Sequence, residues 1–393
     1  MRGKDIKMSF RFIIFSLIAL GIYLSVNYYI GMRTFERISH LTKVSGLCFW
    51  LLFWIVSLSY IIARVSENHV SPQVVNIFEY IGVYYMGIMF YLLLFFAAMD
   101  TLRYLNNKIK FIPDFITGYK NFNIIISLLM LIMISTVLIK GYYNASHTII
   151  KEYSVDINKK SSLGKSINIV MVSDIHLGSI IENKRLRNMV SEINSLNPHI
   201  VILAGDIVDS TIKPFLEKKM AEEFKNIKSK YGTFAVLGNH DIMMGMDEQI
   251  TEELEKKAGV QVLRDRALLI GNGLYIVGRD DASINRSGIK RKALKDILDK
   301  ANINLPIILI DHTPKDIDEA HKENIDLMLS GHTHKGQLYP NSLITSRIYE
   351  IDYGHLNKNH FNIIVSSGYG TWGPPMRIGS QSEVVNIKLN FNN

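Results

Sequence analysis

Aspartate, histidine and asparagine residues form five clusters in the second half of this 393-residue chain, and each cluster follows a short apolar run. Carboxylate, imidazole and carboxamide groups suit divalent ions such as manganese, iron and zinc. Short apolar runs predict β-strands, and an α/β scaffold presents its site at the carboxyl ends of its strands. We therefore expect the clusters to meet and to hold metal. In chain order they are Asp174 with His176, Asp206 with Asp209, Asn239 with His240 and Asp241, His312, and His332 with His334.

If two divalent ions occupied such a site, they would suit hydrolysis at phosphorus. Two cations about 3.5–4 Å apart can share one carboxylate, lower the pKa of a water and stabilise charge that develops on a phosphoryl group. His240 directly follows Asn239, so its ring is expected close to the metals without binding them. A single histidine at a strand end is usually structural, whereas five such clusters in one chain predict a metal centre.

Four motifs carry a family resemblance. Ser-Asp-Ile-His-Leu-Gly, Gly-Asp-Ile-Val-Asp, Gly-Asn-His-Asp and Gly-His-Thr-His occur in this order, and together they resemble the calcineurin-like metallophosphoesterases over residues 165–393. The resemblance implies a four-layer α/β/β/α sandwich with two metal ions (manganese, iron or zinc) at the strand ends, bridged by Asp206. It further implies that Asp174, His176 and His334 bind one ion and that Asn239, His312 and His332 bind the other.

The resemblance also implies two catalytic residues. His240 would assist the leaving group or stabilise the charge of the transition state, and Asp209 would orient its imidazole. The alternative is structural, with Asp209 as a capping residue and His240 as a packed side chain. Where phosphoprotein phosphatases follow the second motif with Arg-Gly, this chain has Ser210-Thr211, so a Ser/Thr protein phosphatase is not expected.

Segments nearer the carboxyl terminus point to a branch of the family. Lys335 follows Gly-His-Thr-His where membrane-anchored bacterial relatives tend to have glycine, although the next two residues, Gly-Gln, are retained. The stretch 368–377, Gly-Tyr-Gly-Thr-Trp-Gly-Pro-Pro-Met-Arg, looks like that bacterial phosphodiesterase branch. Its Arg377 could reach an anionic substrate or form a surface salt bridge. Arg279, Asp280 and Asp281 end a predicted strand and are further candidates to line the cleft.

The elements that must position these residues are predicted after residue 165. Short β-rich runs alternate there with amphipathic helices, at 184–196 and 213–230, which is typical of a layered α/β domain. Gly271-Asn272-Gly273 predicts a hairpin turn. Strands are predicted at 166–172, 199–203, 233–237, 267–270, 274–277, 306–310, 327–329, 362–366 and 384–389.

The first 145 residues are far more apolar. Four stretches come near the roughly 20 residues that a helix needs to cross a bilayer. The first lacks a small-residue cleavage site, so we interpret it as a retained span rather than a secretory signal. Glu79 falls in the first turn of the third stretch and is expected at the level of the lipid headgroups. The four stretches are 10–30, 44–63, 77–99 and 122–139.

Charge and cysteine content exclude several classes of protein. The net charge of +8 comes almost wholly from residues 1–145, which carry +7, so the remainder is near neutral and nucleic acid is not expected as a partner. The single cysteine, Cys48, excludes a disulfide framework and a cysteine-rich zinc site. Four spans put both termini on one side of the cell membrane, but six basic residues flank the spans on that side and seven on the other, so the positive-inside rule selects neither orientation.

The sequence therefore predicts an α+β membrane protein, with a four-span transmembrane domain at 1–145, a linker and lead-in strand at 146–164, and a metallophosphoesterase domain at 165–393. We expect a hydrolase that acts on a phosphodiester, phosphomonoester or pyrophosphate bond. One helix is enough for a tether, so four spans favour a lipid-linked substrate whose tail lies in the membrane. The alternatives are a tethered nucleotide or cyclic-nucleotide phosphodiesterase, and an inactive receptor or scaffold. No pattern specifies an oligomeric state.

Overall fold

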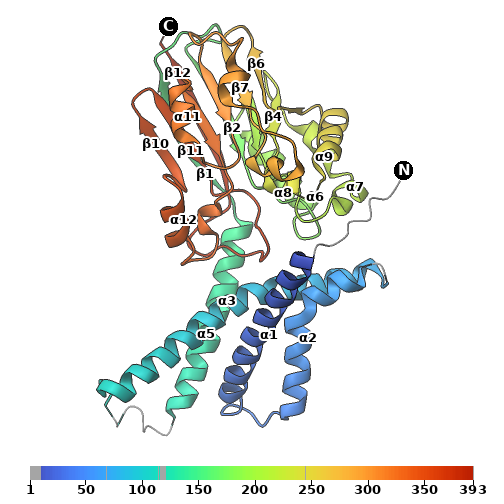
Figure 1. Cartoon of the computed structure of the whole chain (residues 1–393), viewed down its shortest axis with the longest axis vertical. Helices are drawn as coiled ribbons and strands as arrows, with labels where there is room; N and C mark the ends of the chain where they lie inside the picture. The colour runs from blue at the N-terminus through green and yellow to red at the C-terminus, as the bar shows by residue number, and fades with distance from the viewer. Residues whose placement is uncertain (1–9, 68, 114, 116–120, 244, 393) are drawn as a thin grey trace. The chain divides into compact units, whose positions relative to one another are not determined.

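The computed structural model describes residues 10–67, 69–113, 115, 121–243 and 245–392. The chain divides into two compact units, Met1–Ile139 and Lys140–Asn393 (Figure 1). The division falls inside the fourth apolar helix rather than at the predicted boundary after residue 145. The last residues of that helix therefore belong to the second unit.

The first unit is helical. Four helices of the described chain are long and apolar enough to cross a bilayer, and each overlaps one predicted span. Glu79 lies two turns inside its helix, not in the first turn, and forms an ion pair with Arg64 at 2.8 Å. Four residues of the flanking charge count, Arg2, Lys4, Lys7 and Lys120, lie outside the described residues. The helices are α1 (Phe10–Ile38), α2 (Gly46–Ser66), α3 (Pro72–Ile109) and α5 (Phe122–Ser146).

The second unit contains two six-stranded sheets. The order in the first is β1 (Ile149–Ile157), β12 (Glu383–Phe391), β2 (Ser166–Val172), β3 (Ile200–Ala204), β4 (Thr233–Val236) and β5 (Gln261–Val262). The order in the second is β10 (Gly354–Lys358), β11 (Phe361–Val365), β9 (Leu327–Ser330), β8 (Ile307–Ile310), β7 (Leu274–Gly278) and β6 (Arg266–Ile270). Because β2, β3 and β4 are parallel, as are β8 and β9, the carboxyl ends within each set share one edge.

Alternation along each strand builds the layers. On β2, Ile169 is buried between the two sheets, whereas Val170 packs against α6 (Asn183–Ser195) on the outer face. Helices α10 (Leu294–Leu298) and α11 (Ile317–Lys322) cover the outer face of the second sheet. The predicted α/β/β/α sandwich is therefore confirmed.

The predicted lead-in strand is present, whereas one predicted helix differs from its prediction. Residues 146–164 include β1, which pairs in parallel with β12 over its whole length. Its burial alternates from Lys151 to Ile157, although only Val155 and Ile157 are fully buried. The helix predicted at 213–230 is broken in two, because Lys219 adopts a left-handed φ of 49°. The remaining helical segments are α7 (Lys213–Glu217), η1 (Met220–Asn226), α8 (Asn239–Met243), α9 (Asp247–Glu253), η2 (Leu254–Ala258), η3 (Ala282–Ser287), η4 (His334–Gly336) and α12 (Ser342–Ile348).

Candidate metal centre

The loops that follow β2 and β3 run side by side and carry three predicted ligands. The backbone N–H of Asp174 donates to the carbonyl of Gly205 at 3.0 Å, and that of His176 donates to the carbonyl of Asp206 at 3.0 Å. Asp174, His176 and Asp206 have φ values of 52°, 52° and 51°, in the left-handed region that is unfavourable for a residue with a side chain. Strained backbone of this kind gathers at functional sites, where the surrounding structure holds it in place.

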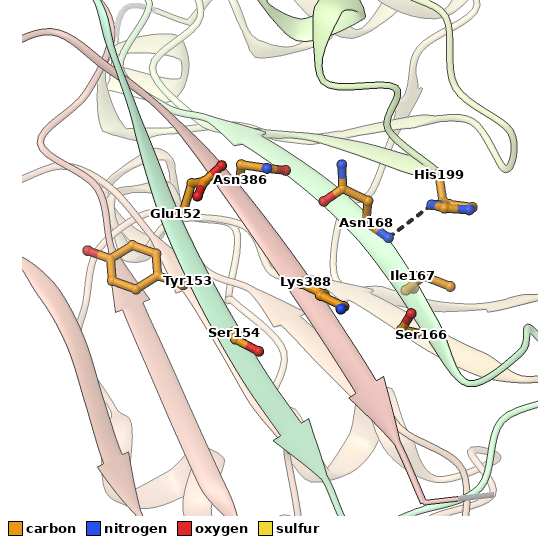
Figure 2. A pocket seen from close by; sticks show the side chains of 9 residues that line it. All are labelled: Glu152, Tyr153, Ser154, Ser166, Ile167, Asn168, His199, Asn386 and Lys388. Carbon is orange, nitrogen blue, oxygen red and sulfur yellow. Dashed lines mark hydrogen bonds between the residues drawn. The ribbon is translucent and has the colours of Figure 1, made fainter.

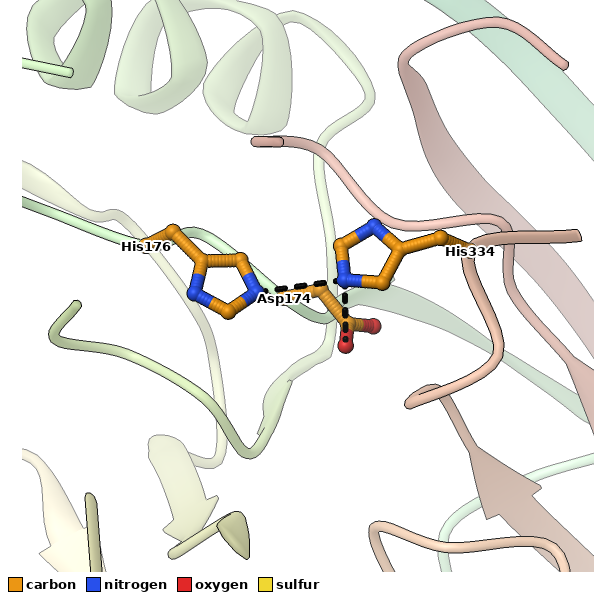
Figure 3. Close-up of side chains that lie close together, drawn as sticks. All are labelled: Asp174, His176 and His334. Atoms are coloured by element: carbon orange, nitrogen blue, oxygen red, sulfur yellow. Dashed lines mark hydrogen bonds and ion pairs between the residues drawn. The ribbon is translucent and has the colours of Figure 1, made fainter. Parts of the chain in front are cut away.

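Asp174, His176 and His334 form the first group of candidate ligands (Figure 3). His334 follows β9, so the group joins the two sheets. The Nε2 atoms of His176 and His334 lie 3.1 Å apart, and Nε2 of His334 is 3.4 Å from Oδ1 of Asp174. All three side chains are buried. Nitrogen and oxygen donors that converge in this way suit one divalent ion.

Asp206, His312 and His332 form the second group, and Oδ1 of Asn239 lies 2.7 Å from Nδ1 of His332. Nδ1 of His312 bonds to the carbonyl of Ala204 at 2.8 Å, so a neutral ring carries its proton on Nδ1 and leaves the lone pair of Nε2 for a metal ion. That Nε2 atom is buried and has no hydrogen-bond partner in the described chain, although it lies 3.1 Å from Oδ2 of Asp206. A buried, orphaned nitrogen that faces a carboxylate fits a metal ligand better than a structural histidine.

Asp206 borders both groups. Its Oδ2 atom is 3.1 Å from Nε2 of His312 and 3.9 Å from Nε2 of His176. Its Oδ1 atom accepts a hydrogen bond from the backbone N–H of His240 at 2.8 Å, which fixes the carboxylate. Burial opposes ionisation of this carboxyl group, but the positive charge that His312 and the other neighbouring histidines carry when protonated brings its pKa below the ordinary value. A carboxylate in this position can contact two ions at once.

The imidazole of His240 stands beside the two groups. Its ring centroid is 5.0 Å from that of His176 and 6.3 Å from that of Trp372. Oδ1 of Asp209 lies between the two imidazoles, 3.9 Å from Nδ1 of His240 and 3.7 Å from Nδ1 of His176. Burial lowers the pKa of His240, which favours a neutral ring. His240 and Asp209, the predicted catalytic pair, thus lie beside the two groups of candidate ligands. The distance between their side chains is longer than a hydrogen bond.

Comparison with known proteins identifies the family. A family model described as Calcineurin-like phosphoesterase matches residues 167–336. The chain is 35% identical over 246 residues to an uncharacterized metallophosphoesterase of Aquifex aeolicus, a match that covers 61% of this chain and 91% of the relative. The chain belongs to the calcineurin-like metallophosphoesterases. The two groups of candidate ligands are therefore interpreted as a metallophosphoesterase metal centre.

Two further metallophosphoesterases match beyond the catalytic motifs. One, an uncharacterized protein of Campylobacter jejuni, is 29% identical over 387 residues, which cover 96% of this chain and 98% of the relative. The other, a transmembrane protein with metallophosphoesterase domain from Danio rerio, is 30% identical over 275 residues, which cover 67% of this chain and 62% of the relative. Together with the four apolar helices, these similarities support a multi-pass membrane protein.

Arg377 occupies a different place from the one expected. Its side chain is fully buried, and burial lowers the pKa of its guanidinium to about 10. It donates hydrogen bonds to the carbonyl of Gly370 at 2.6 Å, to that of Gly368 at 3.1 Å and to Oγ of Ser380 at 3.2 Å. Because these donors are used inside the fold, we correct the expectation of a substrate contact: Arg377 is placed to position the metal loops.

Arg279 and its neighbours also lie outside the cleft lining. The Arg279 guanidinium pairs with Glu319 at 2.9 Å. Asp280 pairs with Arg264 at 2.9 Å, and Asp281 accepts a hydrogen bond from Thr313 at 2.6 Å. A cavity of about 350 Å³ opens beside the ligands instead, and its lining includes Asp206, Asn239, His240, Asn341, Thr345 and Trp372.

Sequence reasoning missed the role of Asp241. Its buried carboxylate accepts hydrogen bonds from the backbone N–H groups of Ile207 at 3.1 Å, Val208 at 3.0 Å and Gly238 at 2.9 Å. These bonds join the loop after β3, which carries Asp206, to the loop after β4. The sequence signal that could have indicated this role is the place of Asp241 at the end of Gly-Asn-His-Asp, shortly after a predicted strand. Asn341 and Thr345, on or next to α12, carried no such signal.

A larger cavity, of about 570 Å³, lies on the outer face of β1, β12 and β2 (Figure 2). Its lining includes Glu152, His199 and Lys388, and it contains none of the predicted ligands that the structure describes. The ring of His199 is held by the backbone N–H of Asn168, which donates to Nδ1 at 2.9 Å. The size of a cavity therefore does not locate the metal centre in this fold.

Proposed function

We propose that this metallophosphoesterase is a hydrolase of the cell membrane that uses two divalent ions to cleave a phosphodiester, phosphomonoester or pyrophosphate bond. The observation that carries the proposal is the position of Asp206 between the two ligand groups. When bound, manganese, iron or zinc would activate a water and neutralise charge on the phosphoryl oxygens. One ion would be held by Asp174, His176 and His334, and the other by Asn239, His312 and His332, with Asp206 between them.

The protein's own groups supply orientation and protons. In this proposal Nε2 of His240, the ring nitrogen not directed at Asp209, donates a hydrogen bond to the phosphoryl oxygens or the leaving group. Asp209 orients the imidazole from the side of Nδ1. The indole of Trp372 forms part of the cleft wall. Because a scaffold needs no such ligand set, the intact ligands count against an inactive receptor.

We further propose a lipid-linked substrate. Four helices of bilayer-spanning length exceed what a tether needs. A substrate whose tail remains in the bilayer can use that remote binding energy at the reacting phosphate. A tethered nucleotide or cyclic-nucleotide phosphodiesterase has no use for such a tail, and the two candidates therefore differ in a measurable way.

The activity is tested with the full-length protein in lipid nanodiscs, freed of metal and then given Mn²⁺, Fe²⁺ or Zn²⁺. A generic aryl phosphodiester, an aryl phosphomonoester and a pyrophosphate ester serve as substrates. We expect metal-dependent hydrolysis of at least one of them, and none by the Asp206→Asn variant. Absence of hydrolysis with every metal and substrate would favour the inactive scaffold.

The substrate class is tested by comparing an amphiphilic phosphodiester with its soluble headgroup analogue in the same nanodiscs. We expect a higher kcat/KM for the amphiphile. Equal values would favour the tethered nucleotide phosphodiesterase.

A further inference from the structure

Helix α12 has an unusual surface for a helix of a folded domain. None of its seven residues, all of which the structure describes, is buried. Three of them are large and apolar, with exposed fractions of 47% for Leu343, 57% for Ile344 and 64% for Ile348. The apolar residues of a surface helix normally face the core. We call Leu343, Ile344, Ile348 and the 57% exposed Trp372 the apolar rim.

The apolar rim adjoins the catalytic cleft. Thr345 of α12 lines the cleft, and so does the ring of Trp372. The backbone of Trp372 is fixed by the side chain of Gln337, which accepts from its N–H at 2.9 Å and donates to its carbonyl at 2.8 Å. Gln337 stands five residues before α12. The rim is therefore held at the mouth of the cleft by ordered contacts.

The segment that carries α12 is also hydrogen-bonded to the last turns of α5, the fourth apolar helix. Gly141 is part of the last turns of α5, and its carbonyl accepts a hydrogen bond from the backbone N–H of Arg377 at 2.9 Å. The next residue, Ile378, accepts at its carbonyl a hydrogen bond from the backbone N–H of Tyr339 at 2.8 Å, three residues before α12. Two hydrogen bonds thus link the last turns of α5 to the segment just before α12.

We propose that the apolar rim inserts into the boundary between headgroups and acyl chains of the bilayer, and so holds the mouth of the cleft at the membrane surface. Apolar helices that lie in this boundary bury such faces there, and tryptophan is enriched at it. The exposed Arg347 of the same helix can meet lipid phosphates. Membrane contact at the rim goes beyond the proposed hydrolysis, and it gives the lipid-linked substrate of that proposal a route from bilayer to metal.

Single-site labelling of the full-length protein tests the contact. Cys48 is the only cysteine, so Cys48→Ser provides the background. Ile344→Cys places an environment-sensitive fluorophore on the rim. The matched control is Ile303→Cys, which is 52% exposed and precedes β8, at the opposite end of that strand from His312. In nanodiscs we expect blue-shifted emission at position 344, and its quenching by lipids that carry a nitroxide near the headgroup, with neither effect at position 303.

Equal emission and equal quenching at the two positions would overturn the proposal. A blue shift at position 344 without quenching by nitroxide lipids would also overturn it, because it would place a protein surface or a second copy on the rim. Leu343→Cys and Ile348→Cys serve if Ile344→Cys fails to fold. The signal reports position and not turnover, so it is expected unchanged in an Asp206→Asn background, and failure of the contact is distinguishable from failure of the proposed activity.

Discussion

The guanidinium of Arg377 lies 3.3 Å from Nδ1 of His334, on the side of the imidazole opposite the atom that faces the other ligands. The same guanidinium is bonded to the carbonyls of Gly368 and Gly370. Gly368 has a φ of 86°, and a Cβ atom there would come within 2.8 Å of the Cβ atom of Asp174. One buried cation therefore holds a tight glycine loop against two ligands of the first group.

Replacement of Arg377 should weaken the metal site without altering substrate contacts. Arg377→Gln leaves buried carbonyls unpaired, which lowers the free energy of unfolding by on the order of 3 kcal/mol. We expect the Kd for Mn²⁺ to rise and activity to return at high Mn²⁺ with an unchanged KM. Metal titration and kinetics of the full-length variant measure both effects. A raised KM with unchanged metal affinity would instead restore the substrate-contact role.

The position of Asp206 between the two groups of candidate ligands separates two kinds of variant. Asp206→Asn should abolish hydrolysis and reduce bound metal, because a carboxamide offers one weak oxygen in place of two charged ones. His240→Ala should lower turnover by about 10²–10⁴-fold with metal retained, since this histidine acts on the proton or charge of the leaving group. Metal analysis of both purified proteins beside their kinetics distinguishes the roles. Full activity of Asp206→Asn would exclude the two-metal model.

The fold brings the predicted ligand candidates together for a physical reason. Each follows an apolar strand, all but His312 lie within a short motif such as Gly-Asp-Ile-Val-Asp, and parallel strands bring their carboxyl ends together. The burial of Arg377 is not predictable in this way, because its acceptors are backbone carbonyls with no residue-type signature. The pairing of β1 with β12 is also not predictable from the sequence. The two strands lie at opposite ends of the domain in sequence, and only two residues of β1 are buried.

Removal of one acceptor at Asp241 should loosen two ligand loops together. In Asp241→Asn, the carboxamide nitrogen would face a backbone N–H in place of an acceptor oxygen, so at least one of three buried donors loses its partner. We expect a loss of about 1–3 kcal/mol in the free energy of unfolding. Urea denaturation with and without Mn²⁺ measures it. Unchanged stability in both conditions would contradict the role assigned to this carboxylate.

The segment before β2 is anchored by a buried ion pair that should respond to pH. Nζ of Lys159 lies 2.7 Å from Oδ2 of Asp326, whose pKa is raised by burial and held down in part by this lysine. Because the pKa of Asp326 is raised in the folded protein, its carboxyl group contributes stability at a pH below its pKa in the unfolded chain, about 3.9. That contribution is lost as the pH rises through its pKa in the folded protein. Lys159→Met raises that pKa further, so it should destabilise the protein more at pH 7.5 than at pH 4.5.

Unfolding measured at the two pH values tests this expectation. The double variant Lys159→Met with Asp326→Asn is the control, because it lacks the titrating carboxyl group. A pH-independent effect of Lys159→Met would show that the ion pair is not the cause.

The position of the unit boundary predicts where a soluble fragment should begin. A fragment that starts at Ser146 keeps β1 but lacks the carbonyls of Gly141, Asn144 and Ala145. These accept hydrogen bonds from Arg377 N–H at 2.9 Å, Ser382 N–H at 3.0 Å and the Arg185 guanidinium at 3.0 Å. At roughly 1 kcal/mol for each bond, the fragment that starts at Lys140 should be more stable by about 3 kcal/mol.

Both fragments should fold and bind metal, because the candidate ligands and both sheets are retained. Urea denaturation and metal uptake of the two fragments test this, and equal stability would show that the last turns of α5 contribute nothing to the fold of the catalytic unit.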